Sequence, residues 1–158
     1  MKLKTLFAVA AAAFLSACLG DSTGSDDVVI PPITELPAGT DTVTTATGLK
    51  YAEISVGTGA LAENGDQVAV HYTGWLANGT GFDTSIGFQP LTFTLGAHQV
   101  VAGFEQGIVG MKVGGKRRLI IPSALGYGNV DVRDQAGRLV IPANSTLIFD
   151  VQLVAVAN

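Results

Sequence analysis

The chain has 158 residues, of which 47% are hydrophobic and 14% are charged, and its formal net charge is −4 at pH 7. Its length allows one ordinary domain plus an extension, and its apolar content excludes a chain that is disordered throughout. The negative charge argues against nucleic-acid binding, which needs a dominant basic field. The local basic cluster Lys116, Arg117 and Arg118 is interpreted as a solvated strand face.

The N-terminus has the features of an export signal. Lys2 and Lys4 precede an apolar run, residues 6–15, that is shorter than the ~20 residues needed to span a bilayer. The sequence Leu-Ser-Ala-Cys at 15–18 resembles the bacterial lipobox, which implies cleavage after residue 17 and lipidation of Cys18. Cys18 is the single cysteine of the chain, so it has no disulfide partner.

These features predict a mature protein that is lipid-anchored outside the cytoplasm. Removing residues 1–17 leaves seven Lys and Arg against thirteen Asp and Glu, a net charge of −6. The residue after the cysteine is Leu19, which resembles lipoproteins that are forwarded to the outer membrane. In a cell with two membranes we therefore expect the protein on the outer membrane, facing the periplasm.

Residues 18–46 are dominated by Gly, Ser, Thr, Asp and Pro, and we interpret them as a flexible tether from Cys18. A flexible chain of this length spans roughly 30 Å root-mean-square, and Pro31-Pro32 is expected to stiffen it locally. Residues 47–158 are then the folded domain.

Alternation of apolar and polar residues predicts strands after residue 47. In residues 67–76, Val68, Val70 and Tyr72 share one face and His71 lies on the other. Asn78-Gly79 then predicts a turn. Similar patterns predict further strands within residues 90–95, 116–122 and 145–156.

One short helix is predicted between these strands. Val101, Phe104, Ile108 and Met111 are spaced to lie on one helical face, and Gly114-Gly115 is expected to end the helix. The fold class is therefore α+β, a curled antiparallel β-sheet (a half-barrel) wrapped around one short α-helix.

Three other kinds of site are excluded by position or spacing. His71 and Tyr72 are adjacent in a strand, so a catalytic triad of His71, Asp83 and Ser85 cannot form if Tyr72 lies on the apolar face. Residues 110–116 match the start of a phosphate-binding loop, but Arg117 stands where Ser or Thr is required and the glycines follow a helix. Two histidines 27 positions apart predict no metal site, and no cofactor is expected.

An ordered series of segments, residues 68–85, 92–128 and 141–153, resembles the FKBP-type peptidyl-prolyl cis-trans isomerases. This resemblance extends from Gly48 to the C-terminus and implies the same half-barrel fold. It also implies catalytic roles for Tyr72, Asp83 and Tyr127. The substrate-binding residues that it implies are Phe82, Leu91, Phe93, Val100, Val101, Phe104, Ile141 and Phe149.

Two positions depart from the family pattern, because Phe104 stands where a floor Trp is common and Leu91 where Phe is frequent. The resemblance implies proline-containing exported polypeptides as substrates, weak binding of macrolide inhibitors and a monomer. A non-catalytic peptide-binding or chaperone module on the same fold is the alternative. The loop at 129–140 is expected either to tune substrate choice or to form a solvated polar hairpin.

Overall fold

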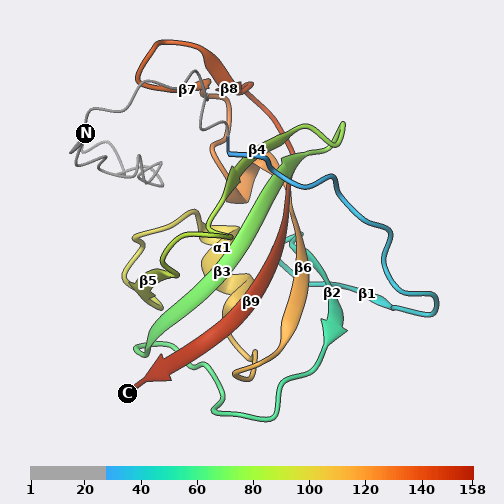
Figure 1. The fold of residues 1–158 in the computed structure, drawn as a ribbon, viewed down its shortest axis with the longest axis vertical. Helices are drawn as coiled ribbons and strands as arrows, with labels where there is room; N and C mark the ends of the chain where they lie inside the picture. The colour runs from blue at the N-terminus through green and yellow to red at the C-terminus, as the bar shows by residue number, and fades with distance from the viewer. Residues whose placement is uncertain (1–27) are drawn as a thin grey trace, which may run out of the picture.

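A computed structural model describes residues 28–158, which form a curved sheet around one short helix (Figure 1). The sheet order is β1-β2-β6-β9-β3-β4, with β5 paired to β3, and every strand pairing in it is antiparallel. The elements are β1 (Thr42–Thr44), β2 (Lys50–Ser55), β3 (Gln67–Leu76), β4 (Gly81–Thr84), β5 (Leu91–Thr94), α1 (Ala102–Ile108), β6 (Lys116–Ile121), the 3-10 helix η1 (Ser123–Leu125), β7 (Val132–Arg133), β8 (Leu139–Ile141) and β9 (Leu147–Ala157).

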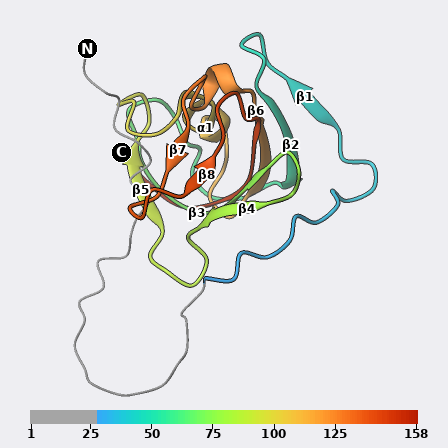
Figure 2. The same cartoon turned by 90° about the horizontal axis from the view of Figure 1, so that it is seen from above.

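The helix lies inside the curve of the sheet, as the view from above shows (Figure 2). The ends of the strand order, β1 and β4, do not pair with each other, so the sheet stays open. This arrangement confirms the predicted α+β class and the half-barrel around one helix. No helix among residues 28–158 is long and apolar enough to cross a membrane.

The strand β3 confirms the predicted alternation of faces. Val68, Val70 and Tyr72 are buried in the hydrophobic core that the sheet and the helix share. β3 pairs along its whole length with β9, where Tyr72 stands opposite Val151. Partners directly opposite each other in an antiparallel pair share a face, so β3 and β9 together build the concave floor of the half-barrel.

The helix α1 is shorter than the sequence predicts. Phe104 and Ile108 are fully buried on its expected inner face. The helix ends at Ile108, before Gly110, whose φ of 83° is a left-handed conformation that glycine adopts at little cost. The expected stop at Gly114-Gly115 is therefore wrong, because an earlier glycine already turns the chain.

Two glycines on α1 allow it to lie very close to the sheet. A Cβ atom at Gly103 would lie 2.4 Å from the side chain of Ile121, and one at Gly107 would lie 2.5 Å from Leu119. Side chains at these two positions would push the helix away from β6. The close approach brings Phe104 of α1 down onto the concave face.

The basic cluster at the start of β6 is not the solvated face that we expected. Lys116 is exposed, but Arg117 and Arg118 are each only 6% exposed, and their guanidinium groups lie on opposite faces of the sheet. Arg118 forms two hydrogen bonds to Asp150 on β9, of 2.5 and 2.7 Å. Charged groups are buried where a carboxylate or carbonyl pairs with them.

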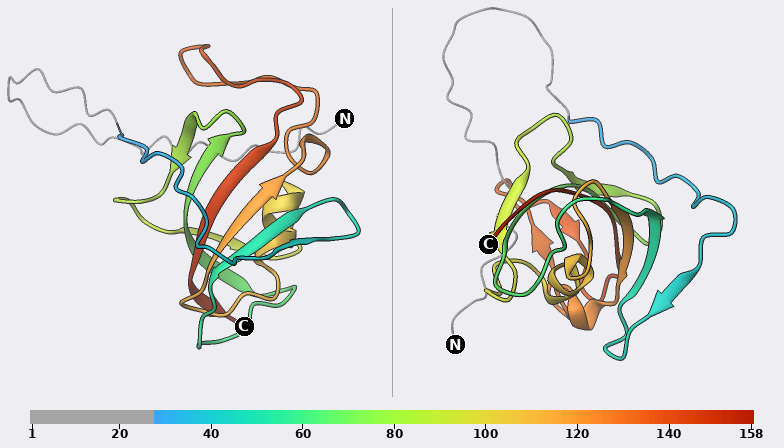
Figure 3. Two further views of the ribbon diagram at one scale, coloured as in Figure 1. Left: turned by 90° about the vertical axis from the view of Figure 1, so that its right-hand side faces the viewer. Right: turned by 90° about the horizontal axis from the view of Figure 1, so that it is seen from below.

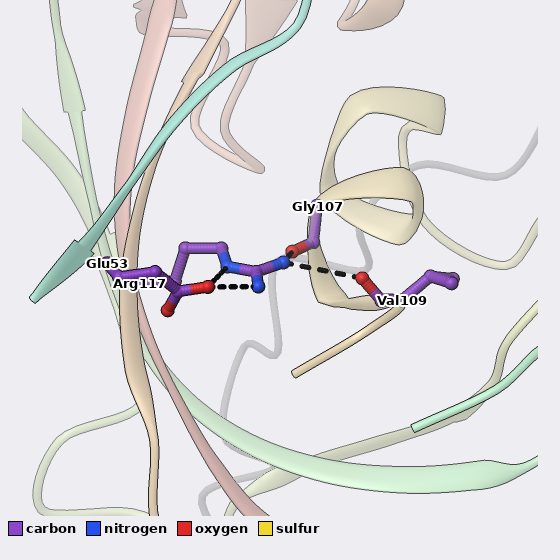
Figure 4. A network of polar contacts seen from close by, with 4 residues as sticks. All are labelled: Glu53, Gly107, Val109 and Arg117. Atoms are coloured by element: carbon purple, nitrogen blue, oxygen red, sulfur yellow. Dashed lines mark hydrogen bonds and ion pairs between the residues drawn. The ribbon is translucent and has the colours of Figure 1, made fainter. Parts of the chain in front are cut away.

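Arg117 joins the sheet to the end of the helix (Figure 4). Its Nε donates to Glu53 Oε1 over 2.9 Å, and its Nη2 bonds the same oxygen. Its Nη1 donates to the carbonyl oxygens of Gly107 at 2.7 Å and Val109 at 3.3 Å. The guanidinium also lies 4.4 Å from the ring centroid of Tyr51. A cation at this end of a helix favourably meets carbonyls that have no partner within the helix.

The N-terminal part of the described chain makes defined contacts with the domain. Residues 42–44 form β1, which pairs with β2, and residues 28–41 run along the outside of the sheet (Figure 3). The part of the expected tether nearest the domain is therefore not a free linker. The signal sequence at 1–17 and the lipidation site Cys18 lie outside the described residues.

The Arg117 contacts predict a large loss of stability on substitution. Arg117→Met keeps much of the side-chain volume but leaves Glu53 and the carbonyls of Gly107 and Val109 without their donor. We expect the free energy of unfolding to fall by about 2–4 kcal/mol. The neighbouring exposed Lys116→Met is the matched control, with an expected change within about 0.5 kcal/mol. Urea unfolding of the three proteins measures both changes, and equal stabilities would contradict the assignment.

Candidate functional site

A short polar contact lies on the concave face of the half-barrel. The Tyr72 hydroxyl of β3 donates a hydrogen bond of 2.6 Å to Asp83 Oδ2 of β4. Tyr72 is almost fully buried, whereas Asp83 is half-buried. Two of the three predicted catalytic residues are therefore in direct contact.

A β-bulge in β4 brings Phe82 and Asp83 to the same side of the sheet. Asp83 stands opposite Gly74, but the next pairing joins Trp75 to Gly81, so Phe82 is the extra residue. In a regular strand, Phe82 and Asp83 would point to opposite faces. A bulge removes this alternation locally and re-aims a side chain. As a result Phe82 contacts the core ring of Phe149 while Asp83 still reaches Tyr72.

Five aromatic side chains meet beneath this contact, and we call them the aromatic cluster. They come from four strands and the helix, and most pairs pack edge to face, the arrangement that ring quadrupoles favour. The ring-centroid distances are 5.7 Å for Tyr72–Phe104, 6.1 Å for Tyr72–Phe149, 5.4 Å for Phe82–Phe149, 6.0 Å for Phe93–Phe104 and 5.1 Å for Phe104–Phe149.

The cluster depends on a residue that sequence reasoning missed. A Cβ atom at Gly74 would lie 2.7 Å from the rings of both Phe82 and Phe149. Without a side chain there, the two rings meet over the backbone of β3. A glycine inside an otherwise well-patterned strand often marks such a close approach, and that signal was present in the sequence.

The remaining predicted residues surround the cluster. Ile141 of β8 is buried in the hydrophobic core. The partly buried side chains that pack against this core include Leu91, Val100, Val101 and Tyr127. Tyr127 lies close enough to Asp83 for the carboxylate charge to affect its hydroxyl. The structure thus brings all eleven residues of the predicted site to the core side of the sheet or its edge.

Burial controls the ionisation of the three polar groups. Burial raises the pKa of Asp83, and hydrogen bonds from Tyr72 and from the Thr84 backbone partly oppose that shift. The pKa values of Tyr72 and Tyr127 are raised well above the ordinary tyrosine range. Burial is the larger cause, and the negative charge of Asp83 is the second. Both hydroxyls therefore keep their protons at neutral pH and can act as hydrogen-bond donors.

His71 and Ser85 lie together on the opposite, outer side. Their Nδ1 and Oγ atoms are 3.2 Å apart, a contact that strand alternation alone did not predict. The Ser85 hydroxyl also accepts a hydrogen bond from the Tyr72 backbone N–H over 2.8 Å, and Asp83 is bonded to Tyr72 on the inner side. The three members of a triad are therefore divided between two faces, as expected.

The loop at 129–140 forms a small hairpin of its own. β7 pairs with β8, and Val132 and Ile141 bury their side chains in the core. At its tip, Asp134 accepts hydrogen bonds from the backbone and side chain of Arg138, which lower the pKa of Asp134. In the described part of the chain, no three His, Cys, Asp or Glu side chains group closely enough to hold a metal ion.

The raised pKa of Asp83 predicts a pH-dependent effect on stability. The folded chain takes up this proton more readily than the unfolded chain, so the contribution to stability is fully present below the unfolded pKa of about 3.9. It is lost as the pH rises through the folded pKa. Asp83→Asn cannot ionise and does not lose this contribution. The free energy of unfolding of Asp83→Asn minus that of the wild type should therefore increase from about pH 3 to about pH 7. Urea unfolding at both pH values measures this difference, and a difference that shrinks with rising pH would contradict it.

Comparisons with known proteins agree with this geometry. Residues 59–154 match the family described as FKBP-type peptidyl-prolyl cis-trans isomerase. An FK506-binding protein of Neisseria meningitidis serogroup B is 51% identical over 110 residues, which cover 69% of this chain and 96% of the relative. The crystal structure of AtFKBP13 aligns with a TM-score of 0.68 and 37% identity, over 74% of this chain and 99% of that one. FkpA from Escherichia coli aligns with a TM-score of 0.62 and 41% identity, over 73% of this chain and 51% of that one. The chain belongs to the FKBP-type peptidyl-prolyl cis-trans isomerases.

Proposed function

We propose that this isomerase accelerates rotation about X-Pro bonds in exported polypeptides by holding the amide in an apolar, water-poor site. The observation that carries the proposal is the Tyr72–Asp83 hydrogen bond directly above the aromatic cluster. This arrangement places a fixed polar group next to buried aromatic side chains, and a small peptide-binding site needs both.

The barrier to peptide rotation defines what the site must achieve. Resonance in the C–N bond gives a barrier of ~18–20 kcal/mol. Uncatalysed X-Pro exchange takes roughly 10–100 s, so a turnover of ~10–10³ s⁻¹ requires a barrier lower by about 3–7 kcal/mol. No nucleophile or proton transfer is needed for this rotation.

Transfer of the amide out of water favours the twisted state. Resonance is lost at the transition state, so the carbonyl there is less dipolar than in the planar amide. An apolar environment therefore penalises the ground state more than the transition state. Phe82, Phe93, Phe104 and Phe149 supply that environment.

The polar groups orient the substrate. Asp83, held in place by the Tyr72 hydroxyl, offers an acceptor, and the protonated hydroxyl of Tyr127 offers a donor, at the border of the aromatic cluster. The apolar side chains that would surround the substrate proline are Leu91, Val100, Val101 and Ile141. A relative carries the name FK506-binding protein. We propose macrolide binding here as well, but weak, because Leu91 and Phe104 are smaller than the Phe and Trp that the family resemblance leads us to expect at these positions.

We also propose that the protein acts while anchored outside the cytoplasm through lipid on Cys18. The support is the lipobox-like sequence ending at this single cysteine. Each buried CH₂ group of a lipid contributes about 0.8 kcal/mol, so several acyl chains can hold a domain whose net charge is negative. In a cell with two membranes we propose the outer membrane, facing the periplasm.

Substitutions at the polar groups test the isomerase mechanism. We expect Asp83→Leu and Tyr127→Phe to lower kcat/KM on a short X-Pro peptide by about tenfold or more, with the fold retained. His71→Ala, on the outer side, is the control and should keep most activity. Exchange NMR or a protease-coupled assay measures the rates, and circular dichroism checks folding. A folded wild type with no rate above background would favour the non-catalytic binding or chaperone module instead.

Cys18→Ser tests the anchor separately. The variant has no thiol to lipidate, so we expect it either in the soluble fraction or as an uncleaved precursor, with no incorporation of labelled palmitate. The wild type should fractionate with membranes and carry the label. Wild-type protein that is wholly soluble and unlabelled would contradict the anchor without affecting the isomerase proposal.

A further inference from the structure

Residues 30–37, with the sequence Ile-Pro-Pro-Ile-Thr-Glu-Leu-Pro, run along the outside of the half-barrel, and we call them the outer strap (Figure 2). Ile30, Ile33 and Leu36 are half-buried, whereas every residue between them is exposed. A period of three is the repeat of the polyproline II helix, and the prolines at 31, 32 and 37 restrict the backbone to its range of φ. The outer strap thus presents one apolar edge to the sheet.

Two backbone carbonyls of the outer strap accept hydrogen bonds from buried side chains of the sheet. Trp75 Nε1 donates to the carbonyl of Pro31 over 2.8 Å, and Arg118 Nη1 donates to that of Thr34 over 2.6 Å. Asp150 holds Nε and Nη2 of Arg118 by two hydrogen bonds. The planar guanidinium is thereby fixed, and its third nitrogen, Nη1, points toward the outer strap. Trp75 is only 3% exposed, although it lies on the face opposite Tyr72 and outside the main core.

The outer strap meets the sheet at the bulge that shapes the catalytic site. Trp75 and Gly81 are the residue pair that closes the bulge around Phe82. Trp75 bonds Pro31, and Ile30 occupies the space where a Cβ of Gly81 would lie, 2.4 Å from the Ile30 Cγ2 atom. The outer strap therefore contacts both members of this pair.

The strand that carries the bulge is short and lies at an edge of the sheet. β4 has four residues, lies at one end of the strand order and pairs only with β3 among the described strands. A short edge strand interrupted by a bulge retains few ladder hydrogen bonds. Thr84, at the other end of β4, is held by its hydrogen bond to Thr73, whereas the Gly81 end borders the bulge and meets the outer strap.

We propose that the outer strap is a positioning element of the isomerase: it clamps the Trp75–Gly81 pair from outside and so keeps Phe82 and Asp83 aimed at Tyr72. The family match begins at residue 59, so this element lies outside the matched residues. The inference rests on the proposed roles of Phe82 and Asp83. The wild-type rate and Asp83→Leu test the proposed function, whereas the ratio of the rates of the outer-strap variant and the wild type tests the outer strap.

The double variant Ile30→Asp/Ile33→Asp, made in the full chain, should detach the outer strap. Trp75 is the single tryptophan, so its emission reports docking directly. We expect a red-shifted emission maximum, stronger acrylamide quenching, and a kcat about tenfold lower with KM nearly unchanged. The matched control is Val28→Asp/Val29→Asp, which adds the same charges where the side chains are 51% and 86% exposed. We expect the control to behave like the wild type in emission and kcat.

Gly81→Ala tests the contact between Gly81 and Ile30 by changing the residue on the sheet. The new methyl group would collide with Ile30, so we expect the same spectral shift and the same loss of kcat. In the detached double variant the collision partner is gone, and Gly81→Ala should add little. This non-additivity distinguishes displacement of the outer strap from damage to β4 itself. If Gly81→Ala alone folds poorly, the double variant and its matched control still decide the proposal through emission and kcat.

Three results would overturn the proposal. A folded double variant with exposed Trp75 but unchanged kcat would show that the outer strap only covers the tryptophan. Emission identical to the wild type in both the double variant and Gly81→Ala would show that the outer strap does not dock in solution. Effects of Gly81→Ala that persist in full in the double variant would place the cause within β4.

Discussion

The edge-to-face contact between Phe104 and Phe149, with centroids 5.1 Å apart, connects the helix to the sheet and the core to the site. Phe104 also meets Tyr72 and Phe93, and Phe149 meets Phe82, so the two rings join α1 to four strands. The same rings are part of the core and form the floor of the proposed site. Each such pair contributes about 0.5–1.5 kcal/mol to stability beyond the effect of its buried area. The packing that stabilises the fold therefore also holds the rings of the site in place.

This packing requires that backbone come unusually close to side chains. Gly107 lets α1 approach Leu119, and Gly74 lets the rings of Phe82 and Phe149 lie over β3. Arg117 then joins the helix end to β2 and β6 through Glu53 and the carbonyls of Gly107 and Val109. Small residues where elements touch, and a buried cation where carbonyls need a donor, hold the helix at the depth that brings Phe104 under Tyr72.

The polar part of the site depends on a departure from regular structure. The bulge at Phe82 places two consecutive residues on one side, where a regular strand would separate them. It delivers Asp83 to a half-buried position beside Tyr72, where burial raises its pKa. The outer strap meets this bulge from the opposite face, so the proposed site has contacts on both sides of the sheet.

The sequence by itself determined the fold class and the inner face of β3, because strand periodicity is local. It also pointed to the aromatic and polar residues of the proposed site, because the family segments occur in order. It did not determine that α1 ends before Gly110, that Arg117 and Arg118 are buried on opposite faces, or that Gly74 makes room for two rings. The sequence also did not indicate that residues 30–37 bind the sheet. Pro31 and Trp75 are 44 positions apart along the chain, and Thr34 and Arg118 are 84 positions apart. Such contacts leave no periodic signal along the chain. Only the tertiary structure decides them, because they depend on which surfaces the curved sheet brings within hydrogen-bond distance.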